Sequence, residues 1–89
     1  MDDVLGWANV ECGRIHDVDF RAAAELALDP IHPRSILSLV EDLIDRGLDL
    51  ARAVPTPTQM RALRQAVEFR LRVAVEDLRE QCARRGRAV

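Results

Sequence analysis

Residues 54–60 read VPTPTQM, and this stretch is the boundary from which the rest of the fold is worked out. Proline suits the first position of a helix, because the N–H that it lacks would have no partner within the helix there. With Thr56 before Pro57 and Gln59 three residues after the threonine, the stretch has the pattern of a capping box. We therefore expect a helix that begins at Pro57.

This last helix is expected to run to about Arg85 and to end at Gly86 in the C′ position. Its apolar residues recur at spacings of three and four, which places them in two stripes on roughly opposite sides. The second stripe must be covered either by other helices of the chain or, at Phe69 and Val73, by a second protomer or a target protein. The main stripe comprises Met60, Leu63, Val67, Leu71, Ala74, Val75, Leu78 and Cys82, and the second comprises Ala62, Ala66, Phe69 and Val73.

A second amphipathic helix is expected over residues 33–54, with Pro33 as its first residue. It is apolar over nearly half of its circumference, which is more than a lone surface helix carries. Gly47 lies inside it and indicates a close helix crossing or a kink, since glycine costs about 1 kcal/mol in a helix interior. Its acidic residues occupy the remaining face: Glu41, Asp42, Asp45 and Asp49.

Two shorter helices precede it. Residues 17–28 fit a helix capped by Asp17 or Asp19 and ended by the Asp-Pro pair that follows. Residues 3–12 fit a helix with Gly13 as its C′ residue, although the same residues also alternate as a strand would. The chain is thus expected to be one all-α domain over residues 1–89, a three- or four-helix bundle with a long C-terminal helix.

Composition restricts the function. A chain of 89 residues is too short for a dinucleotide-binding sheet or an α/β barrel. An aromatic content of 3% argues against modules that stack bases on aromatic side chains. No signal peptide and no membrane-length apolar run is visible, so a cytoplasmic protein with reduced cysteines is expected.

Candidate catalytic and metal-binding residues are few. Cys12 and His16 stand four residues apart, a spacing that suits two ligands on one helical face, but a structural zinc needs four. A Cys–His nucleophile would need an activated thiol and a cleft, of which the sequence has no trace. We therefore expect no enzyme activity, no metal and no cofactor.

Charge is distributed unevenly. Residues 1–51 hold eleven acids and four Arg, a charge of −7, whereas residues 52–89 hold nine Arg and four acids, a charge of +5. One interpretation is a small DNA-binding or antitoxin-like regulator that contacts phosphates through the last helix, although its interleaved acids would oppose a polyanion. The candidate contacts are Arg61, Arg72, Arg79, Arg84 and Arg85.

The favoured interpretation is a protein-binding module. An acidic helical face can imitate nucleic acid or occupy an Arg-rich groove, and its charge would speed association. The expected partner is a host nucleic-acid-handling complex. A homodimer that forms through the second stripe is an alternative that the sequence also allows. The expected partner-binding acids are those of residues 33–54 named above.

A resemblance points the same way. Residues 20–24 (FRAAA), Pro33, residues 36–40 (ILSLV) and Leu43 resemble a pattern in small phage accessory proteins of the ead type. The resemblance implies a short alanine-rich helix, a break at proline and a leucine-rich helix, with no catalytic residues. Small acidic phage proteins are similar in size and character to anti-CRISPR inhibitors, which implies stoichiometric inhibition of a bacterial defence complex.

Overall fold

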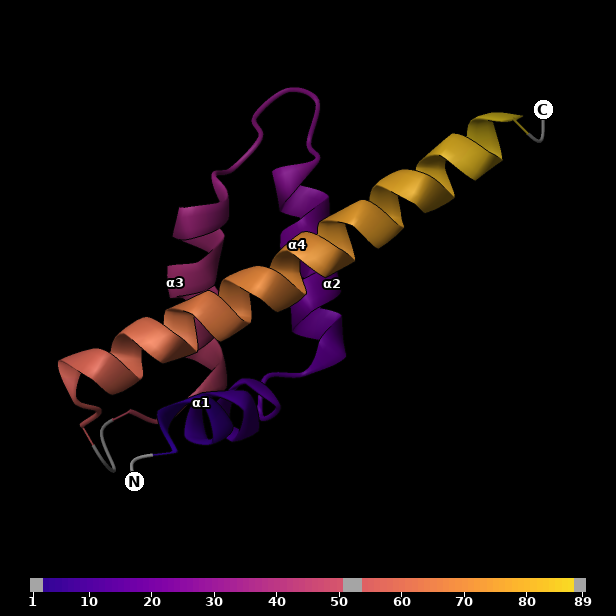
Figure 1. Ribbon diagram of the computed structural model, residues 1–89. Helices are drawn as coiled ribbons and strands as arrows, with labels where there is room; N and C mark the ends of the chain where they lie inside the picture. Colours follow the sequence, from indigo (N-terminus) through magenta and orange to yellow (C-terminus); the bar gives the residue numbers. More distant parts are fainter. Residues whose placement is uncertain (1–2, 51–53, 88–89) are drawn as a thin grey trace.

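The computed structural model describes residues 3–50 and 54–87, and every regular element in that part of the chain is an α-helix (Figure 1). In chain order the helices are α1 (Val4–Cys12), α2 (Asp17–Ala27), α3 (Ile36–Gly47) and α4 (Pro57–Arg87). The expected all-α bundle with a long C-terminal helix is confirmed. Helix α4 lies across the other three and packs against each of them (Figure 1).

The start of α4 has the expected capping box. The backbone N–H of Thr56 donates to Gln59 Oε1 at 2.9 Å, and the N–H of Gln59 donates to Thr56 Oγ1 at 3.1 Å. These bonds satisfy amide groups that a helix start would otherwise leave without partners. From there the main stripe of α4 enters the core, where Leu63, Val67 and Leu71 are fully buried.

Two expectations about the other end of α4 are wrong. The helix continues through Gly86 to Arg87, and no glycine in the described part of the chain has a positive φ. Cys82 belongs to the main stripe by spacing but is exposed. From Asp77 to Arg85, only Leu78 is partly buried. The core therefore ends before the helix does, and residues 77–87 are called the C-terminal arm below.

Helix α3 is shorter than the expected 33–54 at both ends. It begins at Ile36 because Ser35 is the N-cap, with its hydroxyl oxygen accepting from the backbone N–H of Ser38 at 3.2 Å. It ends at Gly47, after which Leu48 turns to extended backbone and buries its side chain. Residues 51–53 of the expected helix lie outside the described residues.

The caps of the first two helices also differ from expectation. His16, rather than Asp17 or Asp19, is the N-cap of α2, and its side chain makes no capping hydrogen bond. Both acids instead lie in the first turn, where negative charge interacts favourably with the helix dipole. Gly13 ends α1 in right-handed geometry, at φ −64° and ψ −15°, and not as a left-handed C′ residue.

The molecule is elongated because α4 extends beyond the helices that pack against it. Its 31 residues span about 46 Å at 1.5 Å per residue, against a longest dimension of 53 Å for the whole molecule. The radius of gyration is 14.7 Å, where a compact domain of this length has about 12 Å. In Figure 1 the arm extends beyond the ends of the other helices.

Candidate functional site

A hollow of about 410 Å³ lies between α2 and the second half of α4. Two large apolar side chains stand at it uncovered: Phe69 is 70% exposed and Val73 is 46% exposed. We call this feature the α2/α4 hollow. It is lined by Asp17, Phe20, Arg21, Phe69, Arg70, Val73, Ala74, Asp77, Leu78 and Gln81.

The hollow exists because the second stripe of α4 is covered along only part of its length. Ala62 is buried and Ala66 is partly buried against the core. Phe69 and Val73 follow one and two turns later on the same stripe and are left at the surface. The other described helices therefore cover the first half of this stripe and leave the second half exposed.

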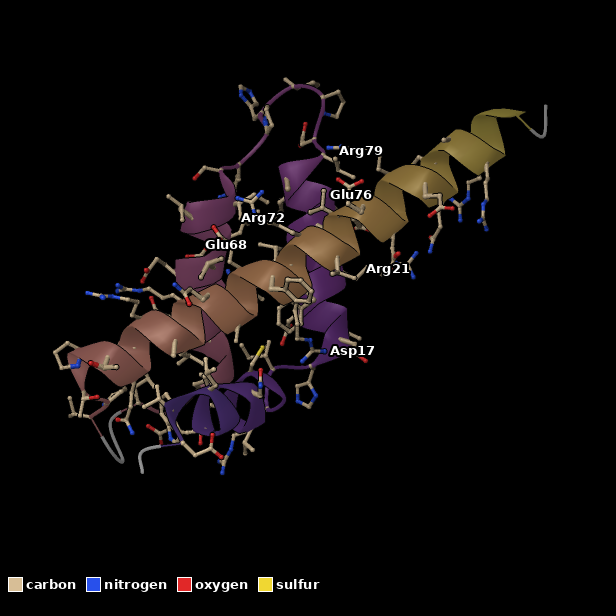
Figure 2. The ribbon with its side chains drawn as sticks, viewed as in Figure 1. Asp17, Arg21, Glu68, Arg72, Glu76 and Arg79 are labelled. Atoms are coloured by element: carbon tan, nitrogen blue, oxygen red, sulfur yellow. The ribbon has the colours of Figure 1, made fainter. Side chains whose placement is uncertain are left out.

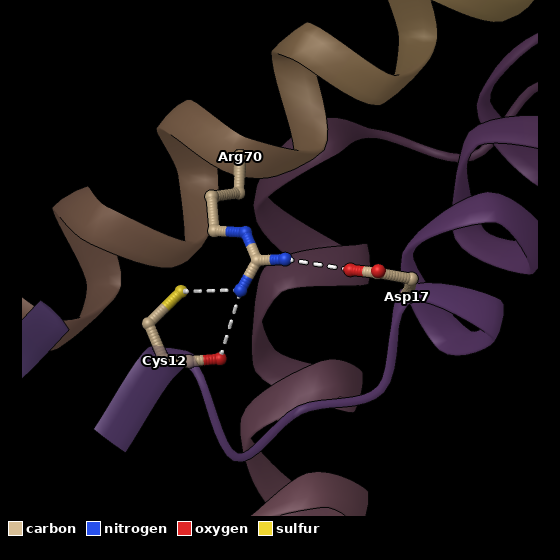
Figure 3. Close-up of polar contacts among 3 residues, drawn as sticks. All are labelled: Cys12, Asp17 and Arg70. Atoms are coloured by element: carbon tan, nitrogen blue, oxygen red, sulfur yellow. Dashed lines mark hydrogen bonds and ion pairs between the residues drawn. The ribbon is translucent and has the colours of Figure 1, made fainter. Parts of the chain in front are cut away.

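Arg70 forms the polar edge of the hollow and joins three helices (Figure 3). Its Nη2 donates to Asp17 Oδ1 of α2 at 2.7 Å, and its Nη1 donates to the carbonyl oxygen of Cys12, the last residue of α1, at 3.3 Å. Its guanidinium carbon lies 4.5 Å from the ring centroid of Phe20. Sequence reasoning missed this residue, because its partners are 50 to 58 positions away and no local pattern indicates them.

The two residues considered for nucleophilic or metal chemistry have different surroundings. Cys12 is buried, and burial raises the pKa of its thiol, although the hydrogen bond and charge of Arg70 oppose that shift. Such a thiol is protonated at neutral pH and is a poor nucleophile. His16 is exposed, and neither residue lines the α2/α4 hollow. Within the described residues, no three His, Cys, Asp or Glu side chains are arranged to hold a metal ion.

The arginines considered for nucleic-acid contacts lie along exposed sides of α4, mostly beside glutamates of the same helix (Figure 2). Arg72 is 3.5 Å from Glu68, and Arg79 is 3.3 Å from Glu76. Arg84 makes the shortest of these pairs, at 2.8 Å from Glu80. Arg61 and Arg85 are exposed and make no ion pair with another described residue.

The acids expected to bind a partner are spread along the outer side of α3 and just beyond its end. Glu41 pairs with Arg64 of α4 at 2.9 Å, and Asp42 pairs with Arg34 at 2.8 Å. Both pairs are about half exposed, so each is worth at most about 1 kcal/mol. Asp45 is exposed on α3, and Asp49 is exposed after α3 has ended. None of these four acids lines the α2/α4 hollow.

None of the helices, over the residues described, combines the length and the apolar character that crossing a bilayer requires. Comparison of the chain with protein-family models, with curated proteins and with solved structures gave no match. The assignment of a function therefore rests on the geometry of the surface.

Proposed function

We propose that this protein is a non-enzymatic protein-binding module whose docking surface is the α2/α4 hollow. The observation that carries the proposal is the exposure of Phe69 and Val73 on a helix whose other apolar stripe is buried at Leu63, Val67, Leu71 and Val75. Aromatic side chains at the centre of an interface commonly supply most of its binding energy. The Asp17–Arg70 pair beside them supplies a polar rim, which is the usual composition around such an anchor.

The charges of α4 support a protein partner over a nucleic acid. Arg72, Arg79 and Arg84 each have a glutamate within 3.5 Å. A phosphate that approached these arginines would meet the carboxylates as well, which weakens attraction to a polyanion. The alternative, a DNA-binding or antitoxin-like regulator, requires binding to random duplex DNA that falls steeply with added salt. We expect no such binding at low salt.

The test is capture of partners from a host lysate by three forms of the protein. Phe69→Glu places a charge in the proposed contact and should weaken binding by about 2 kcal/mol, roughly 30-fold. Leu5→Glu is the matched control, because Leu5 is 69% exposed on α1, away from the hollow. Loss of the same partner with Phe69→Glu but not with Leu5→Glu supports the proposal. Equal capture by all three forms contradicts it.

A narrower proposal names the partner as a host defence complex in the cytoplasm. This protein would then be a phage-encoded, anti-CRISPR-like inhibitor that covers a nucleic-acid-binding surface of that complex. It is supported by the small size of the chain and by the −7 charge of residues 1–51. In this proposal the acids of α3, together with Asp49 just beyond its end, meet basic groups of the target. Reversing the charge at Asp42, Asp45 and Asp49 should then reduce binding and inhibition, and unchanged inhibition would remove the acidic face from the mechanism.

A further inference from the structure

The C-terminal arm borders a second hollow, which adjoins the α2/α4 hollow and shares part of its lining. This second hollow, of about 450 Å³, lies beneath the arm, next to the end of α2 and the loop after it. Leu28, Ile31 and Leu78 give it an apolar floor, and Arg21, Leu78 and Gln81 line both this hollow and the α2/α4 hollow. A largely polar helix that projects without tertiary support is only marginally stable in water, so cover by another molecule would stabilise the arm.

Two acidic or basic side chains among the described residues of the arm, Asp77 and Arg85, make no polar contact within the described structure. They lie four residues before and four residues after Gln81, so all three side chains are on one side of the helix. This side faces the two hollows, because Asp77, Gln81 and Arg85 each line at least one of them.

We infer that the arm pairs antiparallel with the arm of a second copy of this chain, about a two-fold axis that passes close to Gln81. In that arrangement Asp77 of each copy lies level with Arg85 of the other, so two complementary ion pairs form at once. The Gln81 amides meet at the axis, where each can donate to the other. A two-fold interface uses the same patch twice, and the spacing of Asp77, Gln81 and Arg85 makes this patch complementary to itself.

The pairing is distinct from the proposed function. It is centred on Gln81 and depends on Asp77 and Arg85, whereas the proposed docking of a target depends on Phe69 and Val73. The two surfaces meet at Asp77, Leu78 and Gln81, which also line the α2/α4 hollow. A change at Phe69 should therefore leave the dimer intact, and a change at Asp77 should weaken it.

The experiment is sedimentation velocity of the full chain over a hundredfold range of concentration at low salt. We expect a reversible dimer, with a dissociation constant raised about tenfold by Asp77→Arg and by Arg85→Asp, because each change sets like charges opposite one another twice. The double variant Asp77→Arg/Arg85→Asp restores the opposite charges and should return to within about threefold of wild type. Leu5→Glu and Phe69→Glu should leave the dimer unchanged.

The exposed thiol of Cys82 gives an independent readout, since Cys12 is buried. A short bismaleimide should join the two copies through Cys82, which lies one residue from the axis, and Cys82→Ala should abolish the product. A monomeric wild type, a double variant that is not restored, or a dimer that Cys82 does not cross-link would each overturn the inference. A monomer whose capture of partners still depends on Phe69 would overturn this inference and leave the proposed function in place.

Discussion

Arg70 connects the α4 side of the candidate surface to α1 and α2. It donates hydrogen bonds to Cys12 and Asp17 and makes a cation–π contact with the ring of Phe20. Lysine would keep the charge but would lose the fork that bonds to two helices at once. The fold is thus tied together at this edge by one guanidinium group.

Replacing Arg70 should therefore cost stability in a graded way. We expect Arg70→Met to lower the free energy of unfolding by about 2 kcal/mol, since it removes a charged hydrogen-bond pair and a cation–π contact. Arg70→Lys should lose roughly half of that. Urea denaturation measures both, with Arg72→Met as control, because within the described structure the ion pair of Arg72 is with Glu68 of its own helix. Equal losses in Arg70→Met and Arg72→Met would contradict the account.

Cys12 provides a stability change at alkaline pH. Burial raises the pKa of its thiol in the folded state, so the folded protein holds this proton more tightly than the unfolded chain does. The resulting stability is fully present below the ordinary thiol pKa of about 8.5 and is lost as the pH rises through the folded value. The chain has no Tyr, and all thirteen of its basic residues are Arg, so few other groups titrate in this range.

Urea denaturation between neutral and alkaline pH measures this effect. The wild type and Cys82→Ala should lose stability as the pH rises above the ordinary thiol value. Cys12→Ala should begin less stable but should show a flatter profile. The same slope in all three proteins would mean that Cys12 does not titrate as its burial requires.

At the scale of elements, the end of α3 depends on the close contact between Gly47 and the side chain of Ile15. A Cβ atom added to Gly47 would lie 2.7 Å from Cγ1 of Ile15, whose side chain is 2% exposed and cannot move aside. Helix propensity alone predicts that Gly47→Ala at the last position of α3 gains at most about 1 kcal/mol, whereas overpacking costs about 1 to 3 kcal/mol. We expect a net loss of about 1 kcal/mol of stability.

A double-mutant cycle separates the two effects. If the clash causes the loss, Ile15→Ala should cost less in the Gly47→Ala background than in the wild type. Thermal or urea unfolding of the four proteins gives the coupling. Strictly additive changes in the free energy of unfolding, or a stabilising Gly47→Ala, would contradict this. Either result would show that the contact with Ile15 does not exclude a larger side chain at position 47.

The helices themselves follow from local sequence, whereas their ends do so only in part. Thr56 and Gln59 interact within a few residues, so their capping box could be predicted in full. The end of α3 could not, because Leu48 leaves the helix to join a core formed by distant residues. The expected burial of Cys82 is wrong for a similar reason. Its spacing is that of a core residue, but the other helices do not extend far enough along α4 to cover it.

At the scale of the whole molecule, the sequence predicted which residues of the second stripe needed cover but not which would receive it. Spacing places Phe69 and Val73 on this stripe and leaves open whether helices of the chain or another molecule cover them; both are left exposed. The acids of α3 could be predicted to share a face, yet two of them lie beside Arg34 and Arg64, which the sequence does not indicate. Contacts between elements decide these points, and no local pattern encodes them.

Hydrogen–deuterium exchange of the protein alone and in complex with its captured partner tests the proposed docking surface most directly. If the partner seats on the α2/α4 hollow, slowed exchange should be concentrated in the first turns of α2 and in α4 around residues 69–78. Protection confined to α3, or no protection in α4 on binding, would contradict it.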